Sequence, residues 1–105
     1  MASTDHAAGF SALRVALSDL DPAFAPAEWL GRLIAAGLDR LPLPAQGSTL
    51  VRWQALAAVA AHDLSLAKLY EGHTDALAVL GELGRADLAA LGERVAEQGL
   101  SPWLL

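Results

Sequence analysis

Apolar residues recur along most of this chain at the spacing of one helix face, and glycines and prolines separate the helical stretches. No segment alternates β-branched with polar residues, and no Asn-Gly or Asp-Gly turn is present, so nothing indicates a β-hairpin. The pattern predicts an all-α fold, a compact bundle of about five helices. We place these helices at about 7–18, 26–37, 49–62, 63–83 and 85–98.

Residues that start or stop helices set these boundaries. Pro26 suits the first turn of the second helix, and Gly37 suits its C-terminal cap. The segment from Leu38 to Ser48 contains two prolines that no continuing helix accommodates, which predicts a stiff, extended linker between the second and third helices. Asp63 is a good N-cap for the fourth helix, and Gly84 closes it.

Each of the shorter helices offers an apolar stripe for burial at spacings of three and four residues. The stripes predict one shared core. Their members are Phe10, Leu13 and Leu17; Trp29, Leu30, Leu33 and Ile34; Leu50, Trp53, Leu56 and Val59; and Leu88, Leu91 and Val95.

The fourth helix divides into a polar and an apolar face when its residues are placed 100° apart. The polar stripe consists of Lys68, Glu71, Asp75 and Glu82. The opposite face consists of Leu66, Tyr70, His73, Leu77 and Leu80. His73 therefore lies near the centre of an apolar face.

Two interpretations of His73 compete. In the first, it is a neutral core histidine that hydrogen-bonds to a backbone carbonyl or a neighbouring hydroxyl, because buried polar groups normally have such a partner. In the second, Tyr70 and His73 present their polar tips to a ligand cavity. The sequence favours the first interpretation.

Other chemistry finds little support in the residue pattern. Glu71 and Asp75 point away from His73, and His62 precedes the helix break, so we predict no metal site. Ser65 has no assured base beside it, and no glycine-rich phosphate loop is present. The simplest interpretation of the charged residues of the fourth helix is that they form a face exposed to solvent.

The length of 105 residues indicates a single helical domain spanning 1–105. Twelve acidic and seven basic residues give a formal charge of -5, and no basic run is present, so we expect neither nucleic acid nor an anionic membrane as a partner. The chain has no cysteine, no signal-peptide pattern and no apolar run long enough to span a bilayer. These features predict a cytoplasmic protein.

Residues 41–84 resemble the N-terminal helical domain of bacterial acyl-CoA dehydrogenases. Three pieces occur in order: "LPLPAQGST", "RWQALAAVAAHDLSLAKL" and "EGHTDALAVLGELG". The resemblance implies an FAD-dependent enzyme that oxidises the Cα–Cβ bond of an acyl thioester and passes the electrons to an acceptor. It also implies that the helix from Asp63 to Leu83 forms a wall near the acyl and flavin region, with Tyr70, His73 and Leu77 as candidates to line the pocket.

The same resemblance implies that the chemistry comes from elsewhere. In the family, the flavin lies between a middle β-domain and a C-terminal helical domain, and the latter normally supplies the catalytic glutamate. This sequence has no strand-rich segment, and none of its glutamates matches that base by motif. We therefore assign no catalytic residue, expect the chain to be inactive and free of FAD when alone, and expect acyl-CoA to bind only in a full assembly.

The resemblance makes this chain a fragment, a truncated product or one subunit of a split enzyme. Its expected partner is the remainder of a dehydrogenase or a separate flavin-domain subunit. A second hypothesis is a stand-alone helical association module that forms a homo-oligomer or docks on another protein, because a small chain with this much apolar surface benefits from a partner. A third is a small-molecule carrier with a pocket at Tyr70 and His73. The tail "SPWLL" either packs back on the bundle or offers an apolar interface.

Overall fold

Five α-helices make up most of the computed structural model, which describes residues 2–41, 49–100 and 103, with side chains from Gly9 onward. No strand occurs in these residues, so the prediction of an all-α fold is confirmed. The helices are α1 (Ala2–Ser18), α2 (Pro26–Ala35), α3 (Thr49–His62), α4 (Leu64–Glu82) and α5 (Ala86–Glu97).

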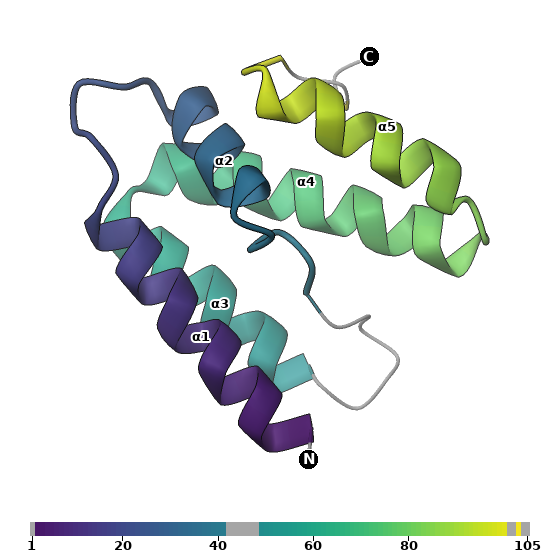
Figure 1. The fold of residues 1–105 in the computed structure, drawn as a ribbon, viewed down its shortest axis with the longest axis horizontal. Coiled ribbons are helices and arrows are strands. Elements are labelled where there is room, and N and C mark those ends of the chain that lie inside the picture. The colour runs from purple at the N-terminus through teal and green to yellow at the C-terminus, as the bar shows by residue number, and fades with distance from the viewer. Residues whose placement is uncertain (1, 42–48, 101–102, 104–105) are drawn as a thin grey trace.

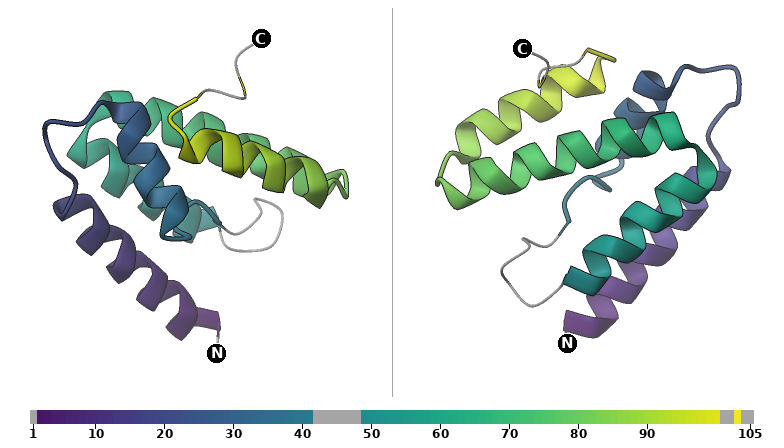
Figure 2. Two further views of the ribbon diagram at one scale, coloured as in Figure 1. Left: turned by 45° about the horizontal axis from the view of Figure 1, so that its top comes forward. Right: turned by 180° about the vertical axis from the view of Figure 1, so that it is seen from behind.

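The helices form two pairs with α2 between them (Figure 1). α1 and α3 lie side by side and run in the same direction, whereas α4 and α5 lie side by side and run in opposite directions (Figure 2). α2 packs against both α4 and α5. The radius of gyration of 13.0 Å is that of a compact domain of this length.

Sharp turns at two glycines allow the chain to reverse. Gly37 and Gly84 adopt φ values of +75° and +71°, which side chains with a Cβ rarely adopt. After Gly84, the Arg85 amide donates to the Leu80 carbonyl at 2.8 Å, and α5 folds back along α4. After Gly37, the Leu38 amide donates to the Leu33 carbonyl at 2.9 Å. This turn is the start of the predicted stiff linker, whose residues 42–48 lie outside the described part of the chain.

The core lies where the two helix pairs meet α2. The predicted stripes of α1, α2 and α3 contribute to it. The predicted stripe of α5 does not, because Leu88 and Leu91 are 39% and 48% exposed and α5 buries the small Ala96 instead. Its buried apolar members are Leu13, Leu17, Leu30, Leu33, Ile34, Ala55, Val59, Leu66, Tyr70 and Ala96.

The prediction for α3 is partly wrong. Leu50 and Trp53 are 66% and 64% exposed, while Arg52 and Ala55 are buried. α3 is rotated relative to the predicted orientation. Arg52 points inward and donates to the Asp75 carboxylate of α4 at 2.6 Å, and Ala55 and Val59 are buried on the same side of the helix. The spacing of apolar residues alone predicts burial of the larger Leu50 and Trp53.

Asp63 caps α4 as the sequence predicts. Its backbone is extended, with φ −164° and ψ 129°, and its Oδ1 accepts a hydrogen bond from the Leu66 amide at 2.9 Å. The carboxylate thus satisfies one of the amides that a helix start leaves without an intrahelical partner. Asp63 also marks the break between α3 and α4, whose sequences are otherwise typical of one continuous helix.

We expect Asp63→Ala to lower the free energy of unfolding by about 1 kcal/mol, because the Leu66 amide loses its acceptor. Urea unfolding followed by helical circular dichroism measures the change. Asp19→Ala is the control, since this exposed aspartate lies just after α1 and should stay within about 0.5 kcal/mol of the wild type. Equal losses in the two variants would contradict the capping role.

Candidate functional site

A cluster of polar side chains around His73 lies inside the fold and joins three segments of the chain. His73 Nε2 lies 2.8 Å from Asp39 Oδ2, and both side chains are fully buried. Trp103 Nε1 lies 2.9 Å from His73 Nδ1. One turn earlier on α4, the Tyr70 hydroxyl donates to the Leu38 carbonyl at 2.8 Å. α4 therefore holds both the segment after α2 and the residue that follows α5.

The geometry determines the tautomer of His73. An indole N–H only donates, so His73 Nδ1 must accept from Trp103 and cannot carry a proton. The hydrogen therefore resides on Nε2, which donates to Asp39 Oδ2. His73 is neutral and bonded at both nitrogens.

Burial and charge determine the ionisation of the two other members. Burial, followed by the negative charge of Asp39, raises the pKa of the Tyr70 hydroxyl, so the phenol stays protonated and donates. Burial also acts to raise the pKa of Asp39, but the hydrogen bonds with His73 and Glu93 outweigh it and hold that pKa below its ordinary value. Asp39 is therefore the charged member of the cluster.

This cluster is arranged to position helices rather than to transfer protons to a substrate. An aspartate next to a histidine is typical of a catalytic base, but such a base needs a free ring nitrogen that faces a ligand. His73 has none, and it is completely buried. His73 is thus a buried core histidine, as the first interpretation expects. The partners given there are wrong, because a carboxylate and an indole bind its nitrogens in place of a carbonyl or a hydroxyl.

The three predicted pocket-lining residues do not meet at one described cavity. Tyr70 and His73 are buried with their polar tips bonded to the protein. Leu77 is half-buried and lines a cavity of about 200 Å³ between α4, α5 and the segment after α2. That they line an acyl pocket in a larger assembly stays a prediction.

Sequence reasoning missed Asp39 and Trp103 as members of the cluster. Asp39 lies within the segment predicted as an extended linker, and Trp103 lies in the tail. The sequence contained one indication of such partners. His73 lies at the centre of an apolar face, and a buried histidine requires hydrogen-bond partners, which can come from another segment. Trp103 packs back on the bundle, while Leu104 and Leu105 lie outside the described residues.

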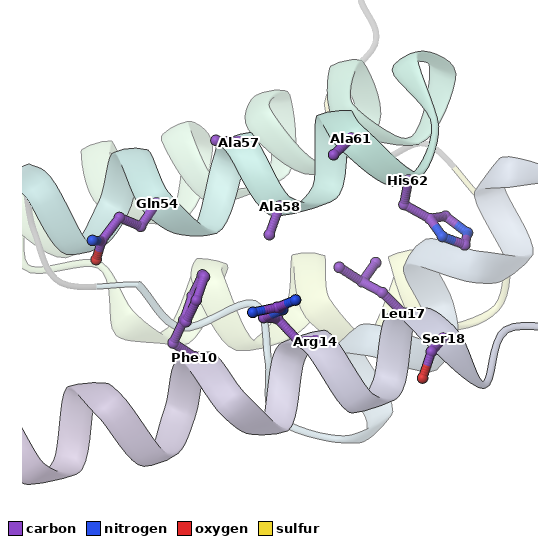
Figure 3. A pocket seen from close by; sticks show the side chains of 9 residues that line it. All are labelled: Phe10, Arg14, Leu17, Ser18, Gln54, Ala57, Ala58, Ala61 and His62. Carbon is purple, nitrogen blue, oxygen red and sulfur yellow. The ribbon is translucent and has the colours of Figure 1, made fainter.

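A second feature is the groove between α1 and α3, with a volume of about 550 Å³. Figure 3 shows Phe10 near the Gln54 end and Leu17 near the His62 end, with Arg14 between them. Apart from these five residues, the lining consists of Ser18, Ala57, Ala58 and Ala61.

The groove is apolar with a cationic centre. No acidic residue lines it, although the chain has a formal charge of -5. Arg14 lies 6.0 Å from the centroid of the Phe10 ring, at the outer range of a cation–π contact. The ring of His62, at the far end, contacts Trp29 of α2 edge-on at 5.5 Å. An apolar segment that carries one negative charge would complement this groove.

Many large apolar side chains are exposed on the described surface. They occur on all helices except α2. They are Val15, Leu50, Trp53, Leu64, Val79, Leu83, Leu88, Leu91 and Leu100. Leu50 and Trp53, Val79 and Leu83, and Leu88 and Leu91 each lie one helical turn apart, and apolar side chains that gather in this way are the kind of surface that a partner covers.

Three further observations bear on function. Within the described residues, no group of three or more histidine, aspartate or glutamate side chains is placed to hold a metal ion. In that same part of the chain, no helix has both the length and the apolar character to cross a membrane. Comparisons with protein-family models, curated proteins and solved structures gave no match.

We expect Trp103→Phe to lower the free energy of unfolding by about 1–3 kcal/mol, because it leaves His73 Nδ1 buried without a donor. Trp53→Phe is the matched control, since Trp53 is 64% exposed and its replacement should change stability by less than about 0.5 kcal/mol. Urea unfolding of both variants measures the difference. A Trp103→Phe protein as stable as the control would contradict the role of the indole N–H.

A substitution at Gly92 tests whether Trp103 packs on α5, because the Trp103 ring occupies the space beside this glycine. A Cβ at this position of α5 would overlap the Trp103 ring, whereas a Cβ at Gly72 of α4 meets nothing within 4 Å. We expect Gly72→Ala to raise stability by about 0.5–1 kcal/mol through helix propensity, and Gly92→Ala to lower it by about 1–3 kcal/mol through overpacking. Urea unfolding followed by tryptophan fluorescence distinguishes them. A stabilising Gly92→Ala would show that Trp103 does not pack there.

Proposed function

We propose that this chain is the N-terminal helical part of an acyl-CoA dehydrogenase-like oxidoreductase, in which it forms a wall and a docking surface while other parts supply the flavin and the base. The resemblance of residues 41–84 to that helical domain motivates the proposal. The all-α fold is compatible with it, and the helix that the resemblance assigns to the wall is α4.

The observation that carries the proposal is the contrast between the interior and the surface. In the interior, Asp39, His73 and Trp103 bond to one another, while large apolar side chains and the α1–α3 groove face outward. A chain built in this way offers a surface to a partner rather than a reactive group to a substrate.

The cofactor chemistry in the proposal belongs to the remainder of the assembly. FAD would accept the hydride when an acyl thioester is oxidised. The described residues do not fit a flavin site, because the α1–α3 groove has a single arginine and no glycine-rich loop for the diphosphate. No step on this chain is therefore derived through FAD.

The same surface favours one alternative, a stand-alone helical association module. In that case the exposed apolar side chains pair with a second copy or with an unrelated docking partner, and no flavin is involved. Trp53 and Leu50 of α3 are the most informative positions, because Gln54 and Ala57 on the same helix line the groove.

Co-expression tests the proposal. The chain is produced alone and together with the product of a neighbouring reading frame that encodes a flavin-binding β-domain. We expect a colourless chain alone, and a co-purified complex whose flavin absorbance is bleached when acyl-CoA is added without oxygen. Trp53→Asp should reduce the yield of the complex, whereas Glu82→Ala on the polar stripe should not.

The possible results separate the hypotheses. A colourless chain that dimerises by light scattering, and that leaves the flavin protein unchanged, would replace the proposal with the association module. A monomer that binds no flavin protein would contradict the proposal and the homo-oligomeric form of the alternative.

A further inference from the structure

The cavity between α4, α5 and the segment after α2 contains a buried carboxylate oxygen that lacks a donor. Asp39 Oδ2 accepts from His73, but Asp39 Oδ1 has no hydrogen-bond partner, and it is the one buried side-chain polar atom of the described residues in that situation. Leaving such an acceptor unsatisfied costs about 1–3 kcal/mol, and more for a charged group. A donor is therefore expected beside it.

Glu93 of α5 is the group in position to supply that donor. It lines the same cavity as Asp39, and a hydrogen bond between the two carboxyls contributes to the pKa of each. Two ionised carboxylates only accept, so they cannot satisfy each other. A protonated Glu93 would donate its O–H to Asp39.

We propose that Glu93 carries a proton in the folded protein and donates it to Asp39 Oδ1, so that one shared proton fastens α5 to the segment after α2. The latch releases when the pH rises and Glu93 ionises. This inference is independent of the proposed function, because it concerns how the helices are held together.

The environment of the pair favours this distribution of charge. Burial, the hydrogen bond to Asp39 and the negative charge of Asp39 raise the pKa of Glu93, against the opposing effect of Arg40. Arg40 is a weak opponent, since its Nε lies 3.4 Å from Glu93 Oε2 and its side chain is 76% exposed. The pKa of Asp39 is lowered. When two neighbouring carboxyls share a proton, the pKa of one rises and the pKa of the other falls.

The other charged and titratable groups near the pair are already engaged. His73 of α4 is neutral and gives its Nε2 hydrogen to Asp39 Oδ2. Tyr70 of α4 stays protonated and donates to the Leu38 carbonyl. Arg52 of α3 pairs with Asp75. None of these is left to donate to Asp39 Oδ1.

The sign of the pH effect follows from these directions. A raised pKa in the folded state means that the contribution of Glu93 is fully present below its ordinary value of 4.5 and is lost as the pH rises through the folded-state value. The contribution of Asp39 is present above its ordinary value of 3.8 and is lost as the pH falls. The latch is therefore strongest in the mildly acidic range.

Carboxyl NMR titration of the wild-type chain tests the proposal directly. We expect the Glu93 carboxyl to titrate above 4.5 and the Asp39 carboxyl below 3.8, the ordinary values of the two groups. For each pH unit by which the pKa of Glu93 in the folded protein exceeds its ordinary value, the equilibrium constant of unfolding should rise about tenfold from low to high pH. A Glu93 carboxyl that titrates at or below 4.5 would overturn the proposal.

Glu93→Gln provides the second measurement, because its amide donates to Asp39 Oδ1 at any pH. We expect its urea midpoint to be independent of pH where that of the wild type falls, and amide hydrogen exchange in α5 to slow relative to the wild type at pH values above the Glu93 transition. Glu97→Gln, at an exposed glutamate of the same helix, should keep the wild-type dependence. An unchanged pH dependence in Glu93→Gln would contradict the proposal. If that variant fails to fold, the wild-type titration decides alone.

Discussion

The hydrogen-bonded series from Asp39 through His73 to Trp103 is the interaction on which the arrangement of this chain depends. Its three members come from the segment after α2, from the middle of α4 and from the residue that follows α5. Without it, α4 would bury a histidine with no partner, which is costly in an apolar interior. With it, α2, α4 and α5 are held as one unit, and Glu93 lies against the Asp39 carboxylate.

The other helix pair is held differently and stays more open. Arg52 of α3 points inward and reaches Asp75 of α4, while Leu50 and Trp53 are exposed. Between α1 and α3, small alanines leave a groove around Arg14 rather than a filled core. The unit of α2, α4 and α5 is therefore held by polar bonds and the α1–α3 side has a groove, while exposed apolar side chains that a partner can cover occur on both sides.

This division bears on how the proposed function would work. A wall of an active site must keep its shape when the partner binds, and in the proposed assembly the cluster at His73 would hold α4 in place. A docking surface needs exposed apolar side chains, which both helix pairs provide. In the proposed assembly the chain would meet both requirements without using Asp39 or His73 as reactive groups, because these side chains are bonded within the fold.

Much of the fold was predictable from the sequence because helix boundaries depend on local chemistry. Asp63 caps α4 by a bond to the amide three residues later, and Gly37 and Gly84 adopt backbone angles that few other residues accept. The burial of Leu66, Tyr70 and His73 follows from the helical period alone. These features need only neighbours in sequence.

Only the tertiary structure decided which groups meet. The partners of His73 lie 34 and 30 residues away, and no periodicity connects them to α4. In the rotated α3, Arg52 bonds to Asp75 across 23 residues, and spacing misplaced Leu50 and Trp53. The sequence by itself determined the helices and the inward position of His73; the packing of distant segments determined that this histidine is a structural link, because both of its nitrogens found partners inside the fold.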